Sequence, residues 1–179
     1  MISRRGRCTP HHTPTSGPRR AAERGASAVE FALVLPALIL VLGAIIDFGF
    51  VFSQQIAMNT AARDASRSGV TSSLSGSGTT CSAIATKARD GAALGGIGLN
   101  KTNVAVTVTG QGGTCTLAAG SGSAGGAATS TPCTGSGAPS ATKTNLSVTL
   151  SYASSPPFPV PFMGTMNLTT KGDFECEYT

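Results

Sequence analysis

The sequence predicts an α+β protein in which a long N-terminal transmembrane helix continues into a small exported domain, with one short helix and a three- to four-stranded antiparallel sheet. Three observations predict this class. A basic leader precedes an apolar run that has no charged residue from position 31 to position 46. Short segments of alternating apolar residues follow between positions 104 and 178. Four of the five cysteines lie beyond the apolar run, as expected for a domain held by disulfides outside the cytoplasm.

The net positive charge of the chain lies in the predicted leader, residues 1–25. Six arginines and one glutamate there give 6 − 1 = +5, which equals the net charge of the whole chain, so residues 26–179 are neutral overall. Positive residues favour the cytoplasmic side of a membrane. We therefore expect a single-pass protein of the bacterial cytoplasmic (inner) membrane, with its N-terminus inside and its C-terminal domain outside. The basic pI describes this leader, so no nucleic-acid partner is expected.

A helix is expected over residues 26–68. From Ala26 to Phe52 the only charges are Glu30 and Asp47, and a helix of this length measures about 40 Å, enough to cross a bilayer. Further along, small residues recur every four positions and predict a face suited to close packing. They are Ala57, Ala61 and Ala65. Gly69 is expected to end the helix, followed by a flexible linker over residues 69–80.

Glu30 is the unusual residue of the apolar segment. A carboxylate in such a segment is costly and usually marks function. Two simpler interpretations are a cleaved secretory signal and a plain single-pass anchor with Glu30 at the headgroup level. The length of the apolar run, the position of Glu30 and the lack of a nearby A-x-A site argue against a secretory signal.

The exported domain is expected over residues 81–179. A helix that ends near Gly91 is predicted by apolar residues at positions i, i+3, i+4 and i+7: Cys81, Ile84, Ala85 and Ala88. Alternation predicts three half-buried strands, carried by Val104, Val106 and Val108, by Leu146, Val148, Leu150 and Tyr152, and by Phe174, Cys176 and Tyr178. The last strand is expected to start at Met166, Leu168 and Thr170, with a bulge or bend at Gly172. Residues 110–142, rich in Gly, Ala, Ser and Thr, are expected to form a long surface loop, and residues 156–161 an extended connection.

The four exported cysteines allow three pairings. Cys81 on the apolar face of the predicted helix and Cys176 on the predicted strand face are expected to pair. Cys115 and Cys133 lie on the two sides of the Gly-rich loop and are expected to form the second pair. A zinc site is the rival interpretation, but the exported part has no CxxC pair and no histidine, so no metal and no cofactor are expected. The two histidines, His11 and His12, lie in the leader and leave no histidine base beyond it, so an enzyme is not expected.

One segment of 44 residues, from 25 to 68, resembles a known family. The resemblance is carried by Arg24-Gly25, Glu30-Phe31, Pro36, Asp47-Phe48-Gly49 and the run from Ala61 to Arg67. These features are similar to those of type IV pilin-like proteins, and among them of the TadE-like minor pseudopilins of tight-adherence pilus systems. The resemblance implies that a prepilin peptidase cuts after Gly25 and leaves Ala26 as the new N-terminus. It also implies assembly roles for Ala26, Glu30, Phe31, Pro36, Asp47, Arg63 and Arg67.

Elementary chemistry gives Glu30 a partner in such a protein. Cleavage after Gly25 would create an α-amino group on Ala26 that is protonated at neutral pH. Ala26 and Glu30 lie four positions apart, and removing one partner of a desolvated ion pair costs several kcal/mol. The pair would therefore set the axial register of a subunit in a helical bundle. Pro36 removes a backbone donor and is expected to kink or locally open the helix.

The function predicted from these observations is that of a non-enzymatic minor pseudopilin-like subunit in pilus biogenesis and surface adhesion. Its expected partners are a prepilin peptidase, other pilin-like subunits, the pilus assembly platform and the lipid bilayer, and incorporation into an extracellular pilus is a further expectation. The alternative is a single-pass envelope protein whose exported domain binds a ligand or a surface and never polymerises. The mature N-terminus discriminates between the two.

Overall fold

The computed structural model describes residues 19–74, 79–133, 145–158 and 164–176, with the side chains of 19–24, 26 and 72–74 left out. The chain divides into two units, Met1–Val41 and Leu42–Thr179. The described elements follow the order α1 (Arg19–Leu74), α2 (Cys81–Gly95), the 3-10 helix η1 (Lys101–Asn103), β1 (Ala105–Gly110), β2 (Gly113–Leu117), β3 (Gly125–Gly126), β4 (Asn145–Ser154) and β5 (Met166–Glu175). The predicted α+β class, with one long apolar helix and one short helix, is confirmed.

Helix α1 is longer than predicted at both ends. It begins at Arg19, before the expected start at residue 26, and it continues through Gly69 to Leu74. Gly69 is therefore not a helix end: it is buried, and a Cβ on it would lie 2.5 Å from Leu146 Cδ2 and 2.7 Å from Ile84 Cδ1. The glycine provides room for the domain to pack closely on the helix. The predicted linker over residues 69–80 is wrong for its helical part, 69–74, and residues 75–78 lie outside the described residues.

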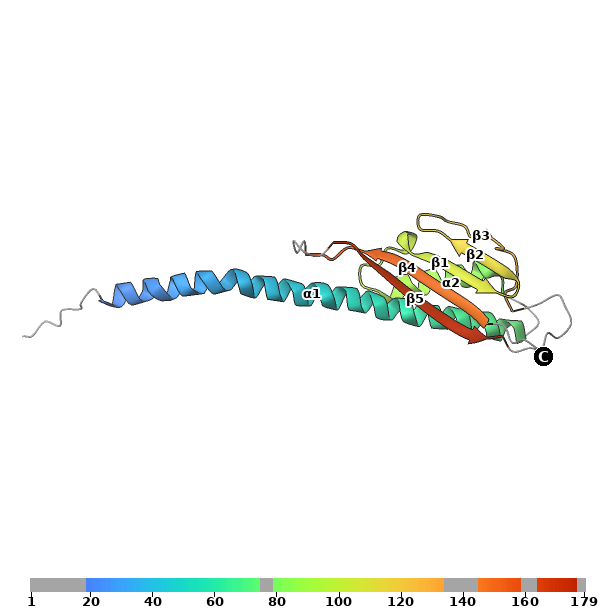
Figure 1. Ribbon diagram of the computed structural model, residues 1–179, viewed down its shortest axis with the longest axis horizontal. Helices are drawn as coiled ribbons and strands as arrows, with labels where there is room; N and C mark the ends of the chain where they lie inside the picture. Colours follow the sequence, from blue (N-terminus) through green and yellow to red (C-terminus); the bar gives the residue numbers. More distant parts are fainter. Residues whose placement is uncertain (1–18, 75–78, 134–144, 159–163, 177–179) are drawn as a thin grey trace, which may run out of the picture. The chain divides into compact units, whose positions relative to one another are not determined.

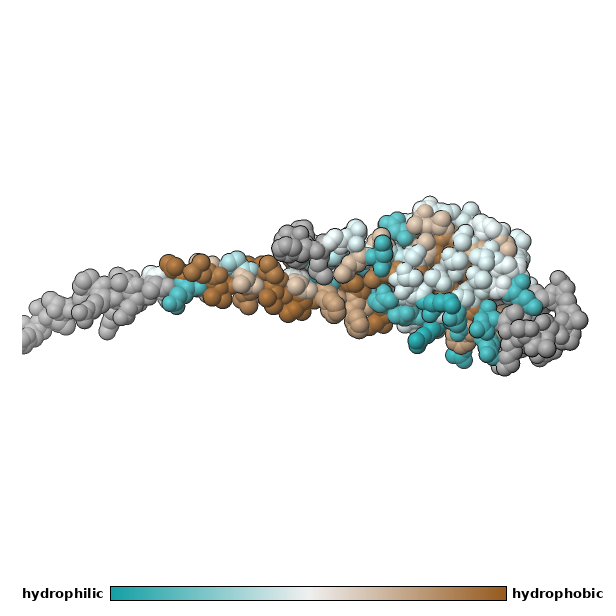
Figure 2. All heavy atoms as spheres, viewed as in Figure 1, coloured by the Kyte–Doolittle hydropathy of each residue, from teal (hydrophilic) through white to brown (hydrophobic). Residues whose placement is uncertain are grey.

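Residues 27–71 of α1 are long and apolar enough to cross a membrane. In the first unit every described side chain from 27 to 41 is exposed, and Figure 2 shows hydrophobic residues along this part of the helix. Large apolar side chains are stable in such exposure only when lipid or other protein surrounds them. This part of the chain therefore has the properties of a single-pass membrane segment.

The second unit contains a five-stranded sheet in the order β3-β2-β1-β4-β5, and every neighbouring pair is antiparallel. Helix α2 and the C-terminal half of α1 cover one face of it (Figure 1). Helix α2 contacts β1 and β2. The C-terminal half of α1 lies against β4 and β5, since Gly69 meets Leu146 and a Cβ on Gly172 would meet Ala62. The core forms between these two layers, from Met58 and Ile84 on the helices and Val106, Val108 and Leu150 on the sheet.

Strands β2 and β3 lie inside the stretch predicted as a surface loop, 110–142, so that prediction is wrong for these residues. Gly110 pairs with Gly113, which leaves a two-residue hairpin loop, and Gly113 has a φ of 116° that favours glycine. Cys115 and Leu117 alternate with exposed threonines and are buried at 0% and 2% exposure. Because the stretch is so rich in small and polar residues, its composition did not indicate the hairpin turn before β2 or the alternation of buried and exposed residues along that strand. Residues 134–144 lie outside the described residues.

The small-residue face predicted on α1 is confirmed. Ala57, Ala61 and Ala65 are 7%, 5% and 1% exposed. Glycines of α2 meet them, since a Cβ on Gly95 would lie 3.2 Å from Ala57 Cβ and one on Gly91 would lie 3.3 Å from Ala61 Cβ. The two helices therefore run antiparallel at close distance. Helix α2 ends at Gly95, one turn beyond the predicted end at Gly91, so that Gly91 serves this contact instead of a cap.

Strand β5 is continuous, and the bulge predicted at Gly172 is wrong. Gly172 pairs with Val148 in a register with β4 that stays regular from Met166 to Glu175. The glycine instead lets β5 approach α1, because a Cβ there would lie 2.6 Å from the carbonyl oxygen of Ala62. Phe174 was predicted on the buried face but is 37% exposed, on the edge strand of the sheet. Tyr178 lies outside the described residues.

The disulfides join Cys81 to Cys115 and Cys133 to Cys176, so the predicted pairing of Cys81 with Cys176 and Cys115 with Cys133 is wrong. The cause is strand β2. It brings Cys115 onto the buried face beside the first turn of α2, where Cys81 Sγ also lies 3.8 Å from the carbonyl oxygen of Val108. Cys176 follows the last residue of β5 and forms its disulfide with Cys133, in the segment after β3.

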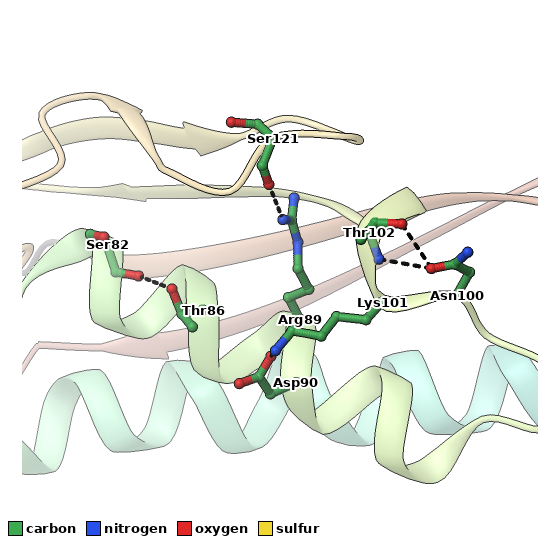
Figure 3. A network of polar contacts seen from close by, with 8 residues as sticks. All are labelled: Ser82, Thr86, Arg89, Asp90, Asn100, Lys101, Thr102 and Ser121. Atoms are coloured by element: carbon green, nitrogen blue, oxygen red, sulfur yellow. Dashed lines mark hydrogen bonds and ion pairs between the residues drawn. The ribbon is translucent and has the colours of Figure 1, made fainter.

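Arg89 holds the Gly-rich segment against α2. Its guanidinium donates to the carbonyl oxygens of Leu117 (3.0 Å), Ala118 (2.6 Å) and Ser121 (2.5 Å), and Figure 3 shows the side chain reaching from α2 to Ser121. Burial lowers the pKa of Arg89, and the neighbouring Asp90 acts in the opposite direction. The guanidinium stays charged at neutral pH, and three carbonyl acceptors offset much of its desolvation.

Replacing Arg89 by methionine is expected to lower the free energy of unfolding by about 2 to 3 kcal/mol, because one buried and two partly buried carbonyl groups lose a charged donor. Amide hydrogen exchange should speed up most over residues 118–124. The matched control is Lys87→Met, which removes an exposed cation from the same helix. Equal loss of stability in both variants would contradict this role of Arg89.

Candidate assembly site on the N-terminal helix

The predicted processing bond lies within α1. Gly25 is exposed, and a Cβ on it would meet nothing within 4 Å. Glycine is a weak helix former, by about 1 kcal/mol relative to alanine, so the helix is easiest to open at this position. The side chain of Ala26 is not among those described. Cleavage between Gly25 and Ala26 stays a prediction.

Glu30 and Phe31 are exposed in the first unit, and Phe31 is 64% exposed. Residues 26 and 30 lie about one turn apart along α1, as the predicted pair requires. Leu33 and Val34, three and four positions further along the helix, are apolar and exposed, so the Glu30 carboxylate stands in an apolar environment once lipid or other helices surround α1. Pro36 is also exposed and lies within α1. Helix α1 is continuous across Pro36, so the predicted local opening is not seen, and a kink stays a prediction.

Asp47 has a different place from the other predicted assembly residues, because it is buried at 0% exposure. Its Oδ1 accepts a hydrogen bond from the backbone N–H of Phe158 at 3.0 Å, and its Oδ2 has no hydrogen-bond partner among the described residues. Asp47 thus attaches the Pro-rich connection after β4 to α1. An assembly role for Asp47 stays a prediction.

Gln54 forms a second polar junction between α1 and the domain, and the sequence reasoning missed it. It is 1% exposed. Its Nε2 donates to the carbonyl oxygen of Ile97 at 3.1 Å, and the hydroxyl of Ser154 donates to its Oε1 at 2.6 Å. The available signal was a pair of glutamines, Gln54 and Gln55, directly after the apolar run of a continuing helix. The two junctions fix the exported domain to one axial position on residues 47–54.

Arg63 and Arg67 are exposed, as is Asp64 between them. The residues on the other side of this turn, Ala62 and Ser66, are buried in the domain. The two arginines therefore form a solvent-facing surface that another subunit could reach.

An open groove of about 660 Å³ runs between α1 and α2. Its two ends differ in chemistry. Phe52, Ile56 and Leu94 line one end, whereas Asp64, Lys87 and Asp90 line the other. In the part of the chain that the structure describes, no cluster of three or more His, Cys, Asp or Glu side chains could hold a metal ion.

The comparisons with known proteins bear on the helix that carries this site. The TadE-like protein family matches residues 25–67, which include Gly25, Glu30, Asp47 and both arginines. No curated protein and no solved structure matches the chain. The resemblance of this segment to TadE-like proteins is confirmed. The match suggests a protein that is associated with the tight-adherence pilus, with a membrane and with pilin-like partners. The family is a structural, pilus-associated one.

Proposed function

We propose, from the TadE-like segment at residues 25–67, that this chain is a minor pseudopilin-like subunit in the biogenesis of a tight-adherence pilus. One observation carries the proposal. The segment that matches the family is also a helix whose described side chains from 27 to 41 are all exposed, although most are apolar. Such a helix needs lipid before assembly and other helices after it. A pilin-like subunit meets both environments, because it moves from the membrane into a filament of packed helices.

The proposal includes processing and topology. A prepilin peptidase removes the leader, residues 1–25, by cutting between Gly25 and Ala26. The leader faces the cytoplasm and the disulfide-bonded domain lies outside the cytoplasmic membrane, where disulfides form and persist. The assembly platform then takes up the subunit, and the exported domain contributes to surface adhesion.

Glu30 is the registry residue in this proposal. An exposed carboxylate among apolar side chains is costly in a bilayer or a helical bundle unless a cation neutralises it. The α-amino group of processed Ala26, of the same chain or of a neighbour, supplies that cation. A subunit displaced along the bundle axis would leave both charges unpaired, so the pair selects one axial position.

Replacing Glu30 by alanine is expected to leave membrane insertion intact and to lower co-purification with the pilus or its machinery at least tenfold, because an unpaired buried charge costs several kcal/mol. The measurement compares membrane fractions with sheared pilus fractions. Asp173→Ala is the control, since Asp173 is an exposed acid on β5, outside the helix that carries the predicted assembly residues. Normal assembly of the Glu30→Ala protein would contradict the registry role.

Mass spectrometry of the membrane-extracted protein tests processing. We expect Ala26 as the first residue in cells with an active prepilin peptidase, and an uncut leader in cells without it. A chain that keeps its leader in both strains and never co-purifies with pilus components would instead be a single-pass envelope protein with a ligand- or surface-binding domain.

A further inference from the structure

Three large apolar side chains of the second unit are exposed close to α1. Leu94, in the last turn of α2, is 90% exposed, Ile97 is 67% exposed and Phe158 is 49% exposed. In a folded domain of this size, exposed large apolar groups that gather in one place mark an interaction surface. We call these three residues the apolar base.

The apolar base lies along one short stretch of α1. The carbonyl oxygen of Ile97 accepts from Gln54, and a Cβ on the neighbouring Gly98 would lie 2.5 Å from Phe50 Cζ. The backbone N–H of Phe158 donates to Asp47. Leu94 lines the groove together with Phe52 and Ile56. All three residues of the base therefore lie beside residues 47–56 of the helix.

The surface of α1 along this stretch is also apolar. Asp47 ends the uncharged run in the sequence, but it is buried, so the carboxylate does not interrupt the exposed surface. Phe48 (66% exposed), Phe52 (57%) and Ile56 (51%) continue that surface, and the rings of Phe48 and Phe52 stack at 6.3 Å. The next charged residue along α1 is Arg63. Charges in the groove appear only at its other end, at Asp64, Lys87 and Asp90.

We propose that the apolar base rests in the outer interface of the same bilayer that α1 crosses, so that the exported domain lies on the membrane before assembly. The occupant is phospholipid, at the boundary between headgroups and acyl chains. A bilayer core takes about 20 helical residues, so a core that begins near Ser27 ends at about residue 46, directly before the stretch of α1 along which the apolar base lies. Apolar side chains that enter this boundary typically reach about 5–10 Å into it. The inference rests on the membrane anchor in the proposed function and is independent of pilus assembly.

The chain contains no tryptophan, so one introduced tryptophan reports one position. The full-length protein is placed in nanodiscs of phosphatidylcholine and phosphatidylglycerol at one copy per disc, with acyl chains brominated at defined depths. Leu94→Trp, Ile97→Trp and Phe158→Trp are the test variants. Phe48→Trp is the control for a lipid-facing position on α1, and Thr116→Trp is the control for an exposed position on β2. Peptide mapping of both disulfides verifies that each variant is folded.

We expect shallow bromines to quench the indole at positions 94, 97 and 158 to an extent comparable with position 48, while the indole at position 116 stays unquenched. Quenching at position 48 but none at the three base positions would overturn the inference and leave the membrane anchor intact. Absence of quenching at position 48 as well would overturn the anchor together with the inference. A third outcome would also overturn the inference. If positions 94 and 97 cross-link between copies in two-copy discs, and lipid does not quench them in one-copy discs, the base contacts a second subunit and not the bilayer.

Discussion

Replacing Gly172 by valine is expected to lower the free energy of unfolding of the exported domain by about 3 kcal/mol or more. A Cβ at this position would lie 2.6 Å from the carbonyl oxygen and 2.7 Å from the carbonyl carbon of Ala62, and 3.0 Å from the nitrogen of Arg63. These are backbone atoms of a helix and cannot rotate away. Strand β5 would have to separate from α1, and the hydrogen bond from Gln55 to the carbonyl oxygen of Thr169 would be lost with that contact.

Local propensity predicts the opposite sign for this substitution. Valine favours strands more than glycine does, so a free edge strand would gain stability. Chemical denaturation of the detergent-solubilised full chain, followed by circular dichroism, measures the difference. Gly164→Val is the matched control, because Gly164 is exposed and a Cβ there would meet nothing within 4 Å. A Gly172→Val domain as stable as the control would show that β5 does not pack on α1 in this way.

The second large effect is expected from Cys81→Ala combined with Cys115→Ala. This bridge spans 34 residues, and a closed loop of that length restricts the unfolded chain by about 4 kcal/mol. The substitutions should therefore remove much of the stability of a small domain. They should also loosen the first turn of α2, whose Cys81 and Ser82 amides donate to the carbonyl oxygens of Ser130 and Ala128.

Thiol labelling of the same double variant distinguishes the two pairings. With the pairing in the structure, Cys133 and Cys176 remain joined to each other and give no label under non-reducing conditions. With Cys81 joined to Cys176 and Cys115 to Cys133, the variant would expose two free thiols. Cys8→Ser, in the predicted leader, is the control and should leave the stability of the domain unchanged.

Both predictions concern how the domain is held, and this bears on the proposed assembly role. Asp47 and Gln54 tie two loops of the domain to α1, while Gly69 and Gly172 let the sheet and α2 approach it. The helix from residue 47 to residue 69 is therefore part of the domain core. Any contact that another subunit makes with this part of the helix is therefore also a contact with the folded domain.

The sequence by itself determined the features that depend on local pattern. The uncharged run predicted the apolar helix, the alanines at four-residue spacing predicted its packing face, and alternation placed β1 and β4 within one or two residues of their observed bounds. The TadE-like segment could also be identified, because its glycine, acid and Ala/Arg tail lie in one continuous segment of the chain. Each of these signals needs only residues that follow one another in the sequence.

The tertiary structure alone decided which distant residues meet. Gly69 and Gly172 carry the sequence signals of a helix end and a strand bend, yet both are contact points that matter only because another element lies against them. The resemblance implied an assembly role for Asp47, and the structure shows its carboxylate buried and accepting a hydrogen bond from the backbone of Phe158. The cysteine pairing depends on strand β2, which the composition of its sequence did not predict. Period and composition report the environment of a residue averaged over its neighbours in the chain, whereas close packing and disulfide geometry depend on neighbours in space.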